Sequence, residues 1–143
     1  MQKFYLLKKR IKKNEGFSKL VYLDKFGNPT IGYGHLIKEN EKFLLNKKYS
    51  TTKLENLFEK DFTEAVHSFS QHYNSKRMNK KIQEILIEMI FQLGIKNTLK
   101  FKKFNFFLKK NFFYLAALEM LNSKWYLQTP KRVEGHIKNL LKY

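Results

Sequence analysis

One short segment of alternating residues interrupts a chain that is otherwise patterned for helices. It runs from Lys19 to His35 and places three turn residues, Gly27, Asn28 and Pro29, between two alternating stretches. Alternation with a period of two is typical of strands, and a cluster of Gly, Asn and Pro is typical of a turn. The segment therefore predicts a β-hairpin or a small meander within a mainly helical protein.

Helical periodicity lies on both sides of this hairpin. An amphipathic helix is expected over residues 3–14, with Gly16 as the breaker just past its end. After a lysine-rich connection, Ser50 or Thr52 can cap a long helix that ends near Gln71, and Glu55 has capping-box spacing from Thr52. Further helices are predicted over residues 79–93, 99–109, 112–121 and 131–142.

These elements predict an α+β fold, with a small β-hairpin lobe and a mainly helical C-terminal lobe joined by the long helix. A single domain is expected over residues 1–143, with lobes at roughly 12–60 and 61–143 plus the N-terminal helix. No stretch approaches the roughly 20 apolar residues of a membrane span. Because the N-terminal segment is too charged for a secretory signal, synthesis in the cytoplasm is expected.

Positive charge is the main compositional anomaly, with a formal net charge of +17. It predicts attraction to polyanions such as nucleic acid, membranes or anionic cell envelopes, although compositional drift explains it equally well. Of the 29 basic residues 26 are lysine, whereas base recognition favours the planar arginine fork, so sequence-specific nucleic-acid binding is disfavoured. The chain has no cysteine, and its four histidines lack metal-ligand spacing, so no metal and no cofactor are expected.

Two carboxylates and a hydroxyl flank the hairpin turn. Glu15 lies at the end of the first predicted helix, Asp24 ends the first strand, and Thr30 begins the second. A glycosidase needs one carboxyl group that stays protonated beside one that stays ionised. The negative end of the helix dipole favours the protonated form of Glu15, solvent at the turn favours ionised Asp24, and Thr30 could hold a water.

The combined spacing resembles a known family of enzymes. Eight residues separate Glu15 from Asp24 and five separate Asp24 from Thr30, as in the phage-type lysozymes, glycoside hydrolase family 24. The resemblance continues through Thr30-Ile-Gly-Tyr-Gly-His35, Phe91-Gln-Leu-Gly94 and Ser123-Lys-Trp-Tyr-x-Gln-Thr-Pro130-x-Arg132, so it covers nearly the whole chain. The segment between the hairpin and Asp61 is shorter than in well-known members.

This resemblance implies hydrolysis of the β-1,4 bond between N-acetylmuramic acid and N-acetylglucosamine in peptidoglycan. Glu15 is then the general acid, Asp24 the base or charge stabiliser, and Thr30 the residue that positions the attacking water. The resemblance also implies substrate contacts at Gly34, Leu36, Phe91, Gln92 and Arg132, and a structural ion pair between His35 and Asp61. Inversion is expected, with the two carboxyl groups roughly 6.5 to 9.5 Å apart and the glycan in a cleft between the lobes.

Bacterial lysis by a phage or prophage is the expected role. A monomer is expected, with bacterial peptidoglycan and an anionic cell-envelope surface as partners, acting after cell release or through a membrane hole. A catalytically silent lysozyme-fold scaffold and a basic nucleic-acid-binding protein are the alternatives. Trp125 is interpreted as core, and the aromatic residues of the C-terminal half as core and helix contacts. That aromatic set comprises Phe101, Phe104, Phe106, Phe107, Phe112 and Phe113. Membrane disruption by this basic, aromatic segment is a separate and weaker hypothesis.

Overall fold

The N-terminal helix fixes the position of Glu15. A computed structural model describes residues 3–142, and in it α1 spans Tyr5–Glu15. Leu7 and Ile11, one turn apart, are fully buried, which leaves the lysines of the other face exposed or paired. Gly16, with φ of 74°, ends the helix, so Glu15 is its last residue.

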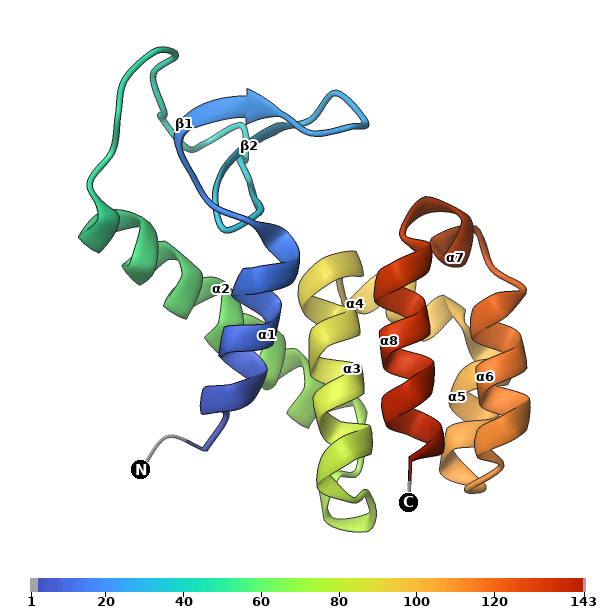
Figure 1. The fold of residues 1–143 in the computed structure, drawn as a ribbon. Helices are drawn as coiled ribbons and strands as arrows, with labels where there is room; N and C mark the ends of the chain where they lie inside the picture. The colour runs from blue at the N-terminus through green and yellow to red at the C-terminus, as the bar shows by residue number, and fades with distance from the viewer. Residues whose placement is uncertain (1–2, 143) are drawn as a thin grey trace. The chain divides into compact units, whose positions relative to one another are not determined.

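A three-stranded antiparallel sheet follows α1 (Figure 1). Its strands are β1 (Ser18–Leu23), β2 (Pro29–Gly32) and β3 (His35–Leu36), in that order across the sheet. The sheet rests on a small core in which Ile31 from β2 packs with Tyr49 and Leu54. The predicted hairpin or small meander is therefore a meander, and the lysine-rich connection after it supplies Tyr49 to the core.

The long helix α2 spans Thr51–His72. The Ser50 hydroxyl accepts a hydrogen bond from the Lys53 backbone amide at 3.1 Å, so Ser50 is the cap. The predicted capping box at Thr52 is wrong, because Glu55 bonds instead to Lys12 of α1 at 2.7 Å and to the Tyr33 hydroxyl at 2.8 Å. These two bonds hold α1, the sheet and the start of α2 together.

The C-terminal half is helical. Its elements are the 3-10 turn η1 (Ser75–Arg77), α3 (Lys80–Leu93), α4 (Ile95–Lys100), α5 (Lys102–Lys109), α6 (Phe113–Leu121), α7 (Lys124–Gln128) and α8 (Pro130–Leu141). Asn79 caps α3, Ser123 caps α7, and Pro130 opens α8, where its missing amide hydrogen costs nothing. Helix α8 contacts α3, α6 and α7 in the centre of this half.

Two details of this half differ from the sequence-based predictions. The helix expected over residues 99–109 is divided, because Phe101 has a ψ of 65° and separates α4 from α5. The aromatic residues interpreted as core are only partly so. Phe104 is fully buried, whereas Phe106 is 53% exposed and Phe112 is 49% exposed.

The chain divides into two compact units, Met1–Glu64 and Ala65–Tyr143, and the boundary falls within α2. The first unit contains α1 and the sheet, and the second contains the helices from α3 onward. The α+β class with a long joining helix is therefore confirmed. Within residues 3–142 no helix is long and apolar enough to cross a membrane.

Candidate active site

The turn after β1 binds the carboxylate of Asp24. Its Oδ1 accepts hydrogen bonds from the backbone amides of Asn28 and Phe26, both at 2.9 Å. The bond from Asn28 holds the pKa of Asp24 below its ordinary value, and the bond from Phe26 adds to this effect, although slight desolvation opposes both. Asp24 is therefore ionised at neutral pH, as the sequence predicted from its place at a turn.

Glu15 lies against the backbone of Gly34, in the turn between β2 and β3. A Cβ atom built at Gly34 would overlap the Oε2 atom of Glu15, and Gly34 also has a φ of 70°, which L side chains rarely adopt. Only glycine meets both conditions. The predicted substrate contact at Gly34 thus also forms one wall of the Glu15 site.

Tyr22 links the two carboxylates. Partial burial raises the pKa of its phenol, and the negative charges of Glu15 and then Asp24 raise it further. Tyr22 is 37% exposed, so its hydroxyl is also open to solvent beside these two charges. Glu15 and Asp24 therefore face a common region of the first unit.

The sheet register places Thr30 in the same region. Tyr22 of β1 pairs with Thr30 of β2, and Thr30 pairs with Leu36 of β3, so the three side chains form one row on one face of the sheet. The Thr30 hydroxyl donates to the backbone carbonyl of Asn28 at 2.8 Å. This row brings together the predicted residues Thr30 and Leu36, and Leu36 is 52% exposed beside the buried Thr30.

His35 lies between two carboxylates. Its Nδ1 is 2.7 Å from Asp61 Oδ2 on α2, and its Nε2 is 2.9 Å from Glu41 Oε1 in the connection after the sheet. Burial favours a lower pKa for His35, but the hydrogen bonds to Asp61 and Glu41 outweigh burial and raise it. The pair of His35 with Asp61 is thus part of a three-residue cluster, in which sequence reasoning missed Glu41.

Gln92, predicted to touch substrate, is held in the second unit by Trp125 on α7 and by Thr129 in the bend between α7 and α8. Its Oε1 accepts from the Trp125 indole at 3.1 Å, and its Nε2 donates to the Thr129 hydroxyl at 3.4 Å. Trp125 is 3% exposed, as expected of a core residue. Phe91, the other predicted contact on α3, is half-buried beside Gln92. These bonds fix which end of the Gln92 amide is donor and which is acceptor.

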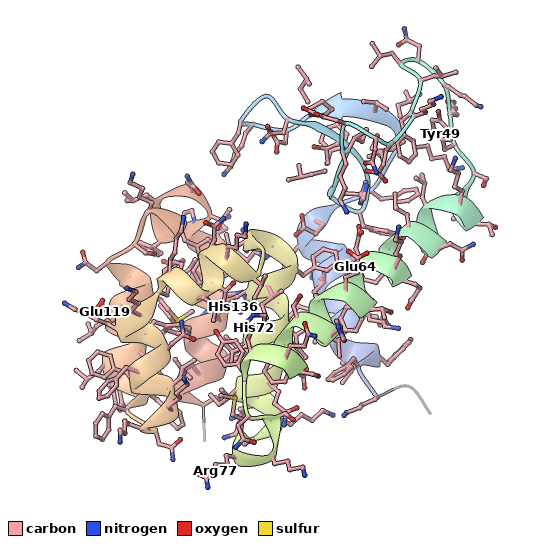
Figure 2. The ribbon with its side chains drawn as sticks, turned by 180° about the vertical axis from the view of Figure 1, so that it is seen from behind. Tyr49, Glu64, His72, Arg77, Glu119 and His136 are labelled. Carbon is pink, nitrogen blue, oxygen red and sulfur yellow. The ribbon has the colours of Figure 1, made fainter. Side chains whose placement is uncertain are left out.

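Arg132, the remaining predicted substrate contact, lies on α8 of the second unit. Its Nε is 3.4 Å from Oε2 of Glu88, a fully buried carboxylate on α3. His136, one turn along α8, places its Nε2 3.8 Å from the same oxygen and is 2% exposed. Figure 2 shows His136 among the helices of this unit. Sequence reasoning missed Glu88 because its partners lie on another helix, although a lone glutamate in an apolar stretch is a signal that could have found it.

No metal site accompanies these residues. Within residues 3–142, no group of three or more His, Asp or Glu side chains is arranged to hold an ion. The first unit offers two carboxylates, a phenol and a hydroxyl, which suits acid–base cleavage of a glycosidic bond.

Comparison with known proteins assigns the chain to a family. The phage lysozyme family matches residues 12–139. Two proteins of Dictyostelium discoideum are similar over 88% of this chain and 88% of their own length. Probable T4-type lysozyme 2 is 38% identical over 151 residues, and probable T4-type lysozyme 1 is 32% identical over 149 residues. The chain therefore belongs to the phage lysozyme family and is a lysozyme, a glycoside hydrolase of the muramidase type that acts on peptidoglycan.

Proposed function

We propose that Glu15 is the general acid, that Asp24 is its ionised partner, and that the reaction inverts the anomeric carbon. The observation that carries this proposal is the placement of the two carboxylates. Two backbone amides of the turn bind Asp24, Glu15 lies against Gly34, and the negative charge of both raises the pKa of Tyr22. One carboxyl group donates its proton to the leaving oxygen, while the other, kept charged by backbone hydrogen bonds, stabilises the cationic transition state or activates water.

Thr30 positions the attacking water in this proposal. Since its hydroxyl proton is directed to the Asn28 carbonyl, its oxygen lone pairs are available to accept a hydrogen bond from water. Its place in the row beside Tyr22 brings that water near both carboxylates. A Thr30→Val variant, which keeps the shape and loses the acceptor, is expected to lose activity without losing its fold.

The residues proposed to contact the glycan are Gly34, Leu36, Phe91, Gln92 and Arg132. The Gln92 amide, oriented by Trp125 and Thr129, supplies directional hydrogen bonding to an acetamido or hydroxyl group.

The biological role we propose is lysis of bacterial cell walls by a monomer. The phage or prophage setting, and access to the wall through a membrane hole or after cell lysis, belong to the same proposal. The net charge of +17 favours docking on an anionic envelope. Lytic activity that stays constant far above physiological salt contradicts this docking.

Reducing ends released from purified peptidoglycan test the catalytic assignment. Glu15→Gln is expected to lower the rate by about 10²–10⁴-fold, since general acid catalysis is worth that much. Glu39→Gln, which makes the same change at an exposed glutamate of the first unit, is the matched control and is expected to retain the wild-type rate. Equal rates in both variants would falsify the assignment of Glu15. No release by the wild type would favour a silent scaffold.

Stereochemistry is tested separately by proton NMR of a short peptidoglycan oligomer during cleavage. The β-linked substrate is expected to give the α-anomer first, before mutarotation. Initial appearance of the β-anomer indicates retention, and it overturns the water-positioning role of Thr30 while leaving Glu15 as the acid.

A further inference from the structure

Helix α6 presents an apolar stripe that no described element covers. Leu115 is 44% exposed, Leu118 is 58% exposed and Leu121 is 41% exposed, at spacings of three residues that place them on one face. Tyr114, at 64% exposed, lies beside them. The opposite face of α6 buries Ala116, Ala117 and Met120 in the helical core. The helix is therefore apolar on both its inner and its outer face.

Aromatic residues of the α5–α6 connection enlarge this surface. Phe112, directly before α6, is 49% exposed, and Phe106 on α5 is 53% exposed. The Phe106 ring contacts the partly buried Phe107 ring, with centroids 5.7 Å apart, and Lys110 places its ammonium 5.9 Å from the Phe106 centroid. Helices α5 and α6 lie side by side in the second unit (Figure 1). We name the exposed side chains of these two helices the α5–α6 surface. It comprises Phe106, Phe112, Tyr114, Leu115, Leu118 and Leu121.

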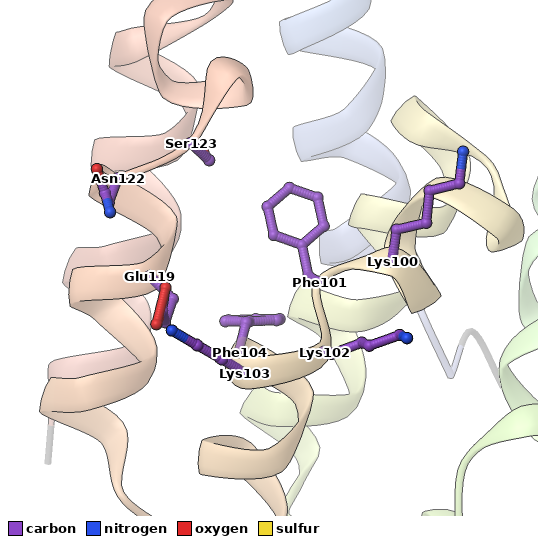
Figure 3. A pocket seen from close by; sticks show the side chains of 8 residues that line it. All are labelled: Lys100, Phe101, Lys102, Lys103, Phe104, Glu119, Asn122 and Ser123. Carbon is purple, nitrogen blue, oxygen red and sulfur yellow. The ribbon is translucent and has the colours of Figure 1, made fainter.

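The charge around the α5–α6 surface is strongly positive. Between residues 100 and 124 the sequence has six lysines and a single acidic residue, Glu119. Glu119 lines a hollow of about 280 Å³ between α5 and α6, to which Lys103 also contributes. Figure 3 shows Lys103 directed toward Glu119, while Lys100 and Lys102 are directed away from it. The one negative charge thus lies opposite a lysine, and the remaining lysines set the sign of the local field.

We propose that the α5–α6 surface docks on an anionic lipid bilayer. Exposed leucine and aromatic side chains flanked by lysine ammonium groups are what an interfacial helix uses, with apolar groups among acyl chains and lysines at lipid phosphates. Lysine stems can lie along apolar surface while their charges stay in water, and Lys110 already places its ammonium over the Phe106 ring.

A second copy of the chain fits this surface less well than a bilayer. Two such surfaces would bring together two sets of lysines with one glutamate in each, and like charges repel. An anionic bilayer supplies both the apolar interior and the opposite charge. The inference is independent of the glycosidase mechanism, because the α5–α6 surface contains none of the proposed catalytic or substrate-binding residues.

Co-sedimentation of the full chain with lipid vesicles tests the proposal. Binding is expected to vesicles of phosphatidylglycerol and phosphatidylcholine, and to be weak with phosphatidylcholine alone. The double variant Leu115→Gln with Leu118→Gln is expected to bind about tenfold more weakly or worse, because the side chains it replaces are those that enter the bilayer. Leu44→Gln with Leu45→Gln, at positions 63% and 74% exposed in the first unit, is the matched control.

A second pair of variants separates charge from apolar contact. Lys109→Gln with Lys110→Gln is expected to weaken binding to the anionic vesicles more than Lys47→Gln with Lys48→Gln, which removes the same charge from the first unit. Equal losses in both pairs mean that net charge alone drives binding, and they overturn the assignment to α5–α6. Wild-type dimers in sedimentation velocity that Leu115→Gln with Leu118→Gln dissociates would instead identify a second copy as the occupant. Unchanged reducing-end release shows that each variant is folded.

Discussion

The two units use carboxylates in opposite ways. In the first unit, Asp24 lies at the surface, and backbone amides of a tight turn bind it. In the second, Glu88 is fully buried, and a guanidinium and an imidazole lie within 4 Å of its Oε2. Asp24 keeps a face toward solvent, where a substrate can reach it, whereas Glu88 has none. A carboxylate held by several hydrogen-bond or charged partners is thus a candidate for chemistry only where it also remains accessible to a substrate.

The two units also differ in how substitutions are expected to affect activity and stability. The first unit has a core centred on three buried side chains, Ile31, Tyr49 and Leu54, and it depends on glycines and on hydrogen bonds between its side chains. The second contains the six helices α3 to α8 and a large apolar core, and α8 contacts α3, α6 and α7. Changes at the first unit's carboxylates are therefore expected to alter activity more than stability, and changes at Glu88 to do the reverse.

The largest effect on stability is expected at Glu88. Glu88→Gln keeps the shape but removes the negative charge that faces Arg132 and His136, so the free energy of unfolding is expected to fall by about 3–5 kcal/mol. Chemical denaturation at neutral pH measures it. Glu84→Gln, on the same helix, is the control and is expected to change stability little. A Glu88→Gln variant with the same free energy of unfolding as the wild type contradicts the view that this carboxylate stabilises the second unit.

A smaller loss of stability, joined to a loss of activity, is expected for Gly34→Ala. The positive φ costs roughly 1–2 kcal/mol for an L side chain, and the new methyl group displaces the Glu15 carboxylate. Gly94→Ala is the control for strain, since Gly94 also has a positive φ, of 83°, with no atom within 4 Å of the new methyl group. Both variants should lose stability in thermal unfolding, and only Gly34→Ala should lose reducing-end release. Equal activity losses would show that strain, and not Glu15, is responsible.

The smallest effect expected is a dependence of stability on pH at His35. Its pKa is raised on folding, so its contribution is complete below the ordinary histidine value of 6.5 and is lost as pH rises through the raised value. For Glu41, desolvation opposes the bonds from the Lys38 amide and His35, which lower its pKa, so its contribution is complete above 4.5 and is lost as pH falls. The cluster should stabilise most between pH 4.5 and 6.5.

Histidine NMR titration and thermal unfolding across pH check this window. Glu41→Gln is expected to lower the pKa of His35 toward its ordinary value and to flatten the pH dependence of the melting temperature above pH 6.5. Glu39→Gln, two residues away and exposed, is expected to change neither. A His35 pKa that is the same in Glu41→Gln and wild type would remove Glu41 from the cluster.

Much of the fold followed from local sequence patterns. The period-two segment, Gly16 after α1, and Pro130 before α8 predicted elements that the structure contains. The division at Phe101 did not follow, because a residue with no unusual propensity takes a turn conformation that only tertiary packing selects. The exposure of Phe106 was also missed, since periodicity shows which residues share a face but not whether another element covers that face.

The candidate site could be predicted in part. The intervals between Glu15, Asp24 and Thr30 can be counted in the sequence. The pairing of Tyr22 with Thr30 depends on the register of β1 against β2, which the sequence does not show. Glu41 and Glu88 were missed for another reason. Glu41 is only six residues from His35, but it lies in an irregular connection where no periodicity shows which side chains meet. Glu88 meets side chains of another helix, and no local pattern indicates such a contact.

Reducing-end release from Glu15→Gln, Asp24→Asn and the double variant tests the central claim, that both carboxylates act on one bond. When two groups act together in one step, the rate losses of the two single variants do not multiply in the double variant. The double variant is therefore expected to be about as slow as the slower single variant. A rate loss in the double variant equal to the product of the two single losses would mean that Glu15 and Asp24 act independently.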